Sequence, residues 1–229
     1  MSADMVTFYI VLTGILAGTG LVMLTLAVVA DRPVADAIRI ESTKPRRLGG
    51  PKLWGMIFAN SILSIAMIYG ATALPGAPLF YEGPAVWWRV LLEVAGILVL
   101  YDFVYYLAHR FLLHGPIKPL YRVHVLHHTA SPPRAQDSLW VHPVETFIGL
   151  ALMIGSTWVV GPVHLWSFAA MFAIYSFMNV VIHGGLEFRG PWRFIGYMAR
   201  KHDTHHKSMK HGNYASITPL FDKLFGTAQ

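Results

Sequence analysis

Long apolar stretches separated by polar segments dominate the chain. The apolar stretches occupy residues 5–30, 53–74, 86–108 and 144–182. A helix needs about 20 apolar residues to cross a bilayer, so each of the first three stretches predicts one crossing. The fourth is almost twice as long and contains Gly161-Pro162, a strong turn signal. The pattern therefore predicts an all-α integral membrane protein with about four to five transmembrane or re-entrant helices.

The composition agrees with a membrane protein. Of the 229 residues, 55% are hydrophobic and only 13% are charged, whereas a soluble domain carries about 25% charged residues. The chain contains no cysteine, which excludes disulfides, thiolate metal sites and cysteine-held iron–sulfur clusters. So hydrophobic a chain is not expected to bind nucleic acid.

The basic residues predict how the helices are oriented. All Lys and Arg residues except Arg89 lie in segments 31–52, 109–143 and 183–229. The predicted helices bring these three segments to one side of the membrane. Cytoplasmic loops carry an excess of Lys and Arg, so we expect this side to be cytoplasmic.

Nine of the 12 histidines lie in clustered spacings that are typical of metal ligands. Residues three or four apart share one helical face, and neutral imidazole suits iron, zinc or copper. The predicted topology places all nine on the cytoplasmic side, and two adjacent metals suit so many ligands better than one. The candidate metal ligands are His109, His114, His124, His127, His128, His183, His202, His205 and His206.

Other polar residues are candidates for weaker roles. His142 and His211 lie singly on the same side, where each either binds a metal or hydrogen-bonds a ligand. Asp102 precedes His109 by seven residues and is expected to accept a hydrogen bond from a ligating histidine, or else to pack between helices. Glu145 is expected to support a ligand or anchor the histidine-bearing segments. His164 lies at the opposite end and is assigned no role.

Two further patterns lie within the apolar stretches. Gly14 and Gly18 have the spacing of residues that let transmembrane helices approach closely, which predicts close packing within the fold, with dimerisation as the weaker alternative. The aromatic and methionine residues before His183 either line a substrate channel or pack in the core; they are Phe172, Tyr175, Phe177 and Met178.

The order and spacing of these motifs resemble the fatty acid hydroxylase/sterol desaturase superfamily of membrane oxygenases. The resemblance covers residues 95–228, so we expect one membrane domain, residues 1–229, with N-terminal transmembrane helices in residues 1–94. The matching motifs are Asp102-x-x-Tyr105-x-x-x-His109-Arg110-x-x-x-His114, Leu120-Tyr121-x-x-His124-x-x-His127-His128, His142-Pro143-x-Glu145, Asn179-x-x-x-His183, His202-x-x-His205-His206, Asn213-Tyr214 and Phe221-Asp222-Lys223-Leu224-Phe225-Gly226-Thr227.

The resemblance implies a di-iron centre held by the nine histidines in a helical cap on the cytoplasmic face. Such a centre activates O2 to oxidise a lipid C–H bond, and zinc can replace iron in a preparation. Some family members have histidine where this chain has Asn179. Asn179 therefore either binds metal, directly or through water, or hydrogen-bonds a neighbouring helix.

The leading hypothesis is a membrane-bound hydroxylase of a fatty acyl, sterol-like or carotenoid lipid. A desaturase with the same metal centre is the first alternative, and a non-catalytic membrane metal-binding protein is the alternative from another class. The chain has no dinucleotide fingerprint and no cysteine for an iron–sulfur cluster. We therefore expect a separate electron donor, a ferredoxin or a cytochrome, to dock on the basic face.

Overall fold

The computed structural model describes residues 3–40, 50–73 and 79–229. Of the basic residues discussed above, Lys44, Arg46 and Arg47 lie outside these ranges. Short 3₁₀ turns and one π-helical turn connect the α-helices. The α-helices are α1 (Ala3–Val29), α2 (Gly50–Ala73), α3 (Trp87–Ala108), α4 (Lys118–His128), α5 (Pro143–Val160), α6 (Leu165–Val181), α7 (Arg193–His206) and α8 (Leu220–Leu224).

Four helical segments within the described ranges are long and apolar enough to cross a membrane. They are Asp4–Val29, Gly50–Ala73, Trp87–Leu113 and Pro143–Val160. The fourth apolar stretch forms two helices, because α5 ends at Val160 and α6 begins at Leu165. Gly161 has a φ of 106° in this turn, a conformation that glycine adopts without a steric penalty. The predicted all-α membrane fold is confirmed.

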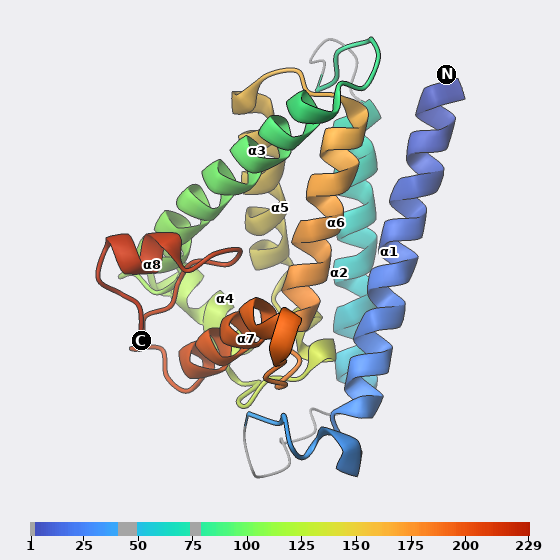
Figure 1. Ribbon diagram of the computed structural model, residues 1–229. Coiled ribbons are helices and arrows are strands. Elements are labelled where there is room, and N and C mark those ends of the chain that lie inside the picture. Colours follow the sequence, from blue (N-terminus) through green and yellow to red (C-terminus); the bar gives the residue numbers. More distant parts are fainter. Residues whose placement is uncertain (1–2, 41–49, 74–78) are drawn as a thin grey trace.

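The long helices form a bundle with the short helices gathered at one end (Figure 1). α1 packs against α6, α2 packs against α5, and α3 contacts both α5 and α6. Aromatic and aliphatic side chains fill the bundle, among them Phe8, Ile97, Phe168 and Phe172. α4, α7 and α8 carry or cover the histidines at the end away from the N-terminus (Figure 1).

A buried glutamate of α3 binds the start of α6 at the end of the bundle opposite the histidine clusters. The Glu93 carboxylate accepts hydrogen bonds from the backbone N–H of His164 at 2.8 Å and the Ser167 hydroxyl at 2.7 Å. Arg89 donates to the same carboxylate at 2.8 Å, so both charges are paired. The His164 ring caps the first turn of α6 by accepting from the Trp166 N–H. His164 thus has a structural position far from the clustered histidines.

The expected packing role of Gly14 and Gly18 is wrong. Both glycines are exposed, and a Cβ atom added to either would meet no heavy atom within 4 Å. Their four-residue spacing puts them on one face of α1, as predicted. That face lies outside the core of the bundle, because the buried residues Phe8, Leu12 and Met23 occupy the other side of the helix.

Candidate metal centre

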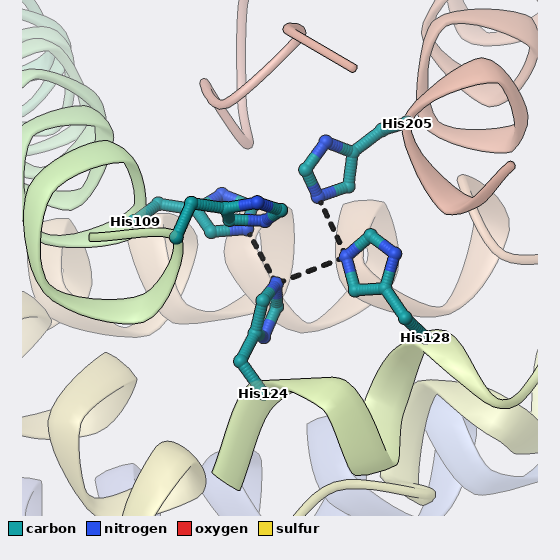
Figure 2. Close-up of side chains that lie close together, drawn as sticks. His109, His124, His128 and His205 are labelled. Carbon is teal, nitrogen blue, oxygen red and sulfur yellow. Dashed lines mark hydrogen bonds between the residues drawn. The ribbon is translucent and has the colours of Figure 1, made fainter. Parts of the chain in front are cut away.

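The nine clustered histidines assemble into two groups, each compact enough to hold one ion. The potential ligand atoms within each group lie within 4.8 Å of one another. Figure 2 shows four members of the larger group, with their rings converging from three different helical segments. The larger group consists of His109, His114, His124, His128 and His205, and the smaller group of His127, His183, His202 and His206.

Helical spacing distributes the histidines between the groups. On α4, His124 and His128 are one turn apart and join the larger group, whereas the adjacent His127 points to the smaller one. On α7 the pattern is reversed, because His202 and His206 share the smaller group and His205 joins the larger. Each triplet therefore supplies both groups, as residues one position apart on a helix point in different directions.

A π-helical turn brings the remaining pair together. Residues His109–Leu113 continue α3 as a π-helix, and the His114 N–H donates to the His109 carbonyl at 2.9 Å. A π-turn aligns residues five apart, and such turns occur frequently at functional sites. The wider turn therefore places both imidazoles in the larger group, although an ordinary α-helix would separate them.

Hydrogen bonds fix the outer nitrogen of most rings. A carbonyl oxygen only accepts, so each Nδ1 atom that contacts one must carry the proton. His124 makes its outer contact with a carboxylate, because its Nδ1 lies 2.8 Å from Oε1 of Glu145. The carbonyl acceptors belong to Tyr214 for His109, Met209 for His114, Trp140 for His127, Asn179 for His183, Gly212 for His205 and Ala130 for His206.

In each group, two inner nitrogens face each other without a proton between them. The Nε2 atoms of His109 and His124 are 2.9 Å apart, although both rings carry their proton on Nδ1. His127 and His183 face each other in the same way in the smaller group, at 3.1 Å. Two lone pairs at this distance repel each other unless a cation lies close to both.

Protonation of the rings does not supply that cation at neutral pH. Burial, followed by the neighbouring His127, lowers the pKa of His183 to about 3. Burial and adjacent imidazoles likewise hold the pKa values of His124, His205 and His206 well below the usual histidine range. In addition, the buried Nε2 of His114 has no hydrogen-bond partner among the described residues. Neutral, convergent imidazoles of this kind fit a transition-metal ion in each group.

A C-terminal strap, residues 209–218, supplies three of the carbonyls that orient the larger group. Two buried carboxylates hold it in place. Asp222 accepts from the N–H groups of Tyr214 at 2.7 Å and Ala215 at 3.0 Å, and it pairs with the buried Lys201 at 2.8 Å. The strap therefore connects the end of the chain to the orientation of His109, His114 and His205.

Asp102 is the second carboxylate that holds the strap. It accepts from the N–H groups of Ser216, Ile217 and Thr218 at 2.8–3.0 Å, and from the Thr218 hydroxyl at 2.7 Å. The expected hydrogen bond from a ligating histidine to Asp102 is therefore wrong, although the residue lies on the correct side of α3. Two helical turns separate Asp102 from His109, and the strap occupies that interval.

Among the described residues, the other candidate ligands belong to neither histidine group. His142 caps α5 by accepting from the Val144 N–H, and His211 contacts the side chain of Gln229. The backbone carbonyl of Asn179 accepts from His183, while Asn179 also lines the neighbouring cavity.

A cavity of about 370 Å³ extends from the histidines into the membrane-spanning bundle. Its walls come from α1, α2, α3, α5 and α6, and it reaches both histidine groups through His109 and His127. Phe172 and Tyr175 line it, as one of the two sequence interpretations expected, whereas Phe177 and Met178 do not. Tyr101 and Tyr105 also line it and were not predicted, although their four-residue spacing with His109 marks a single helical face.

A substitution of Glu145 tests whether the hydrogen bond to the outer ring nitrogen of His124 contributes to metal affinity. Replacing Glu145 by glutamine removes the charge that supports His124, and we expect metal affinity to fall about 10- to 100-fold, as is usual for such partners. Competition with a chelator measures the affinity. Glu187→Gln is the matched control, because that carboxylate pairs with Arg200 outside the histidine groups. Equal affinity in the Glu145 variant and the unchanged protein would contradict the expectation.

Comparison with known proteins finds relatives named as sterol monooxygenases and aldehyde decarbonylases. Rat (Rattus norvegicus) methylsterol monooxygenase 1 is 29% identical over 206 residues, which cover 85% of this chain and 68% of the rat protein. Very-long-chain aldehyde decarbonylase GL1-11 of Oryza sativa subsp. indica is 35% identical over 150 residues, covering 62% of this chain and 54% of the rice protein.

A plant sterol enzyme is similarly related. Methylsterol monooxygenase 2-2 of Arabidopsis thaliana is 33% identical over 150 residues, covering 62% of this chain and 54% of its own length. The chain thus spans about half the length of these plant relatives. No solved structure matches the chain. The fatty acid hydroxylase family matches residues 94–227, the region that contains all nine clustered histidines, and the chain belongs to this family.

Proposed function

We propose that the chain is a membrane-bound di-iron oxygenase that uses O2 to hydroxylate a C–H bond of a lipid. The observation that carries this proposal is the pair of all-histidine groups at the end of an apolar cavity within the membrane-spanning helices. Family membership and relatives named as sterol monooxygenases support an oxidoreductase that acts on lipids.

The histidines would hold one iron ion in each group. When bound, iron supplies the redox chemistry that O2 activation and attack on an unactivated C–H bond require, whereas zinc does not change oxidation state. Two observations support the view that the histidine groups suit metal ions. Lone pairs of inner nitrogens face each other, and the buried Nε2 of His114 has no hydrogen-bond partner among the described residues. Zinc in a purified preparation is consistent with this proposal, because imidazole ligands bind both metals.

The residues of the cavity position the substrate relative to the metals. The apolar walls exclude water and hold a hydrocarbon segment, and the histidines at the end of the cavity determine which carbon reaches the metals. The Tyr105 ring lies 5.2 Å from the His109 ring, centre to centre, so it borders the space where the reacting carbon must sit. Tyr101 and Tyr175 lie farther along the same cavity.

The substrate is a fatty acyl, sterol-like or carotenoid lipid. The relatives are named for methylsterols and very-long-chain aldehydes, which differ in shape but share a large apolar body. Desaturation is the alternative outcome at the same centre, because removal of a second hydrogen can replace addition of oxygen. A metal-binding protein without catalysis is the alternative from another class.

We place the metal centre on the cytoplasmic face, from the distribution of Lys and Arg. Electrons then come from a separate ferredoxin or cytochrome that docks on this basic side, because the chain has neither cysteine nor a nucleotide fingerprint. Sustained turnover by purified protein supplied only with iron, O2 and lipid would contradict the need for a donor.

Lipid mass spectrometry of cells with and without the chain tests the reaction. We expect a lipid that gains one oxygen atom when the chain is present and not when His127→Ala replaces it. Loss of two hydrogens would instead identify a desaturase. An unchanged lipid profile with a metal-loaded protein would favour the non-catalytic alternative.

A further inference from the structure

A groove runs along the membrane-spanning part of the bundle between α1 and α6. Ile15, Gly18 and Val22 form its α1 side, and Ala173, Ile174 and Phe177 form its α6 side. Apart from Thr19 the lining is apolar, and both helices are predominantly apolar. Hydrocarbon of the surrounding bilayer is therefore the medium that contacts this groove.

A single residue, Thr19, lines both the groove and the cavity that reaches the histidines. Its two neighbours on α1 are glycines, with Gly18 on the groove side and Gly20 on the cavity side. Neither glycine contributes a side chain, so the wall between bilayer and cavity is thin at this position. A Cβ atom added to either glycine would meet nothing within 4 Å, which shows that open space flanks Thr19.

α1 is the least buried of the four candidate membrane spans in the described residues. Only 11% of its apolar window is buried in the protein, against 33% for the corresponding windows of α3 and α5. The N-terminal half of α1 contacts α2, where the Thr13 and Tyr69 hydroxyl groups are hydrogen-bonded at 2.6 Å. α1 and α6 pack closely against each other, and apart from Thr19 the groove between them has an apolar lining, so a hydrocarbon chain that enters there meets mainly apolar side chains.

We propose that the α1–α6 seam at Thr19 is a lateral portal through which one hydrocarbon chain of a bilayer lipid reaches the cavity. The substrate class rests on the proposed function, but the portal itself is a property of the fold. A lipid that uses it never leaves the bilayer, so its chain does not become exposed to water on the way to the histidines.

The test uses a phosphatidylcholine that carries a diazirine in the middle of one acyl chain. The full-length protein is reconstituted into nanodiscs with this lipid, irradiated and digested, and labelled peptides are measured by mass spectrometry. We expect labelling of the cavity residues Phe172 and Tyr175. Gly18→Leu fills the groove side of the portal and should abolish this labelling while leaving labels on lipid-facing Ile10 and Leu24 unchanged.

Gly14→Leu is the matched control, because Gly14 is an exposed glycine one turn away on α1 and does not line the groove. It should retain cavity labelling. Ala173→Leu fills the same groove from α6 and should reproduce the loss. Unchanged cavity labelling in Gly18→Leu, or an equal loss in Gly14→Leu, would overturn the portal. Labelling requires no turnover, so a protein that is labelled in the cavity but oxidises no lipid when supplied with iron, O2 and an electron donor would refute the proposed function but not the portal.

Discussion

Replacing His202 by alanine is expected to empty the smaller histidine group and to abolish lipid oxidation. The smaller group has four imidazoles, so this change leaves three. His205→Ala leaves four in the larger group and should retain more metal. Activity should fall at least about 100-fold for His202→Ala, since loss of a residue that only supports a ligand already costs about 10- to 100-fold.

Metal per chain by plasma mass spectrometry and lipid product by chromatography provide the two readouts. His211→Ala is the matched control, because His211 lies near the same end of the chain but contacts Gln229 and belongs to neither group. It should keep full metal content and activity. Two metals per chain in His202→Ala, or an equal loss in the control, would contradict the assignment of ligands.

Replacing Asp102 by asparagine is expected to loosen the C-terminal strap and to remove metal selectively from the larger group. The carboxylate accepts four hydrogen bonds from the strap, and the asparagine amide nitrogen cannot accept any. Loss of two bonds to a charged group lowers the free energy of unfolding by about 3 kcal/mol or more. The carbonyls that orient His109 and His205 then lose their fixed positions, whereas the acceptors of the smaller group lie outside the strap.

Metal content should therefore fall from two ions per chain to one, together with a lower melting temperature. Glu93→Gln separates this effect from simple destabilisation. Glu93 is also a buried carboxylate on α3 with hydrogen bonds to backbone and hydroxyl groups, but it lies at the other end of the bundle. It should lower the melting temperature without changing metal content. Equal metal loss in both variants would show that Asp102 acts only through stability.

The helices were predictable because membrane crossings have a strong sequence signature. Apolar length alone located α1, α2 and α3 to within a few residues, and Gly161-Pro162 located the turn between α5 and α6. The convergence of the histidines was also predictable, since spacings of three and four residues place side chains on one helical face. The domain division into residues 1–94 and 95–228 stays a prediction.

The division of the histidines into two groups could not be read from the sequence. It depends on the π-helical turn after α3 and on which neighbours of α4 and α7 face each other. The role of the strap was hidden for another reason. Its contacts with His109 and His205 use backbone carbonyls, which any residue type supplies, so no side-chain pattern marks them.

Two predictions were wrong because the spacing of residues along a helix does not show which segment of the chain packs against them. Asp102 occupies the face of α3 that the seven-residue interval predicts, yet the strap provides its partners. Gly14 and Gly18 have the spacing for close packing, yet they lie on the exposed face of α1. In both cases the missing information was the position of another segment of the chain.

Anomalous diffraction at the iron edge, from protein purified and loaded with ferrous iron without oxygen, tests whether each histidine group binds one iron ion. We expect two separate iron peaks per chain, one enclosed by the larger histidine group and one by the smaller. A single peak, or iron bound away from these imidazoles, would contradict this expectation.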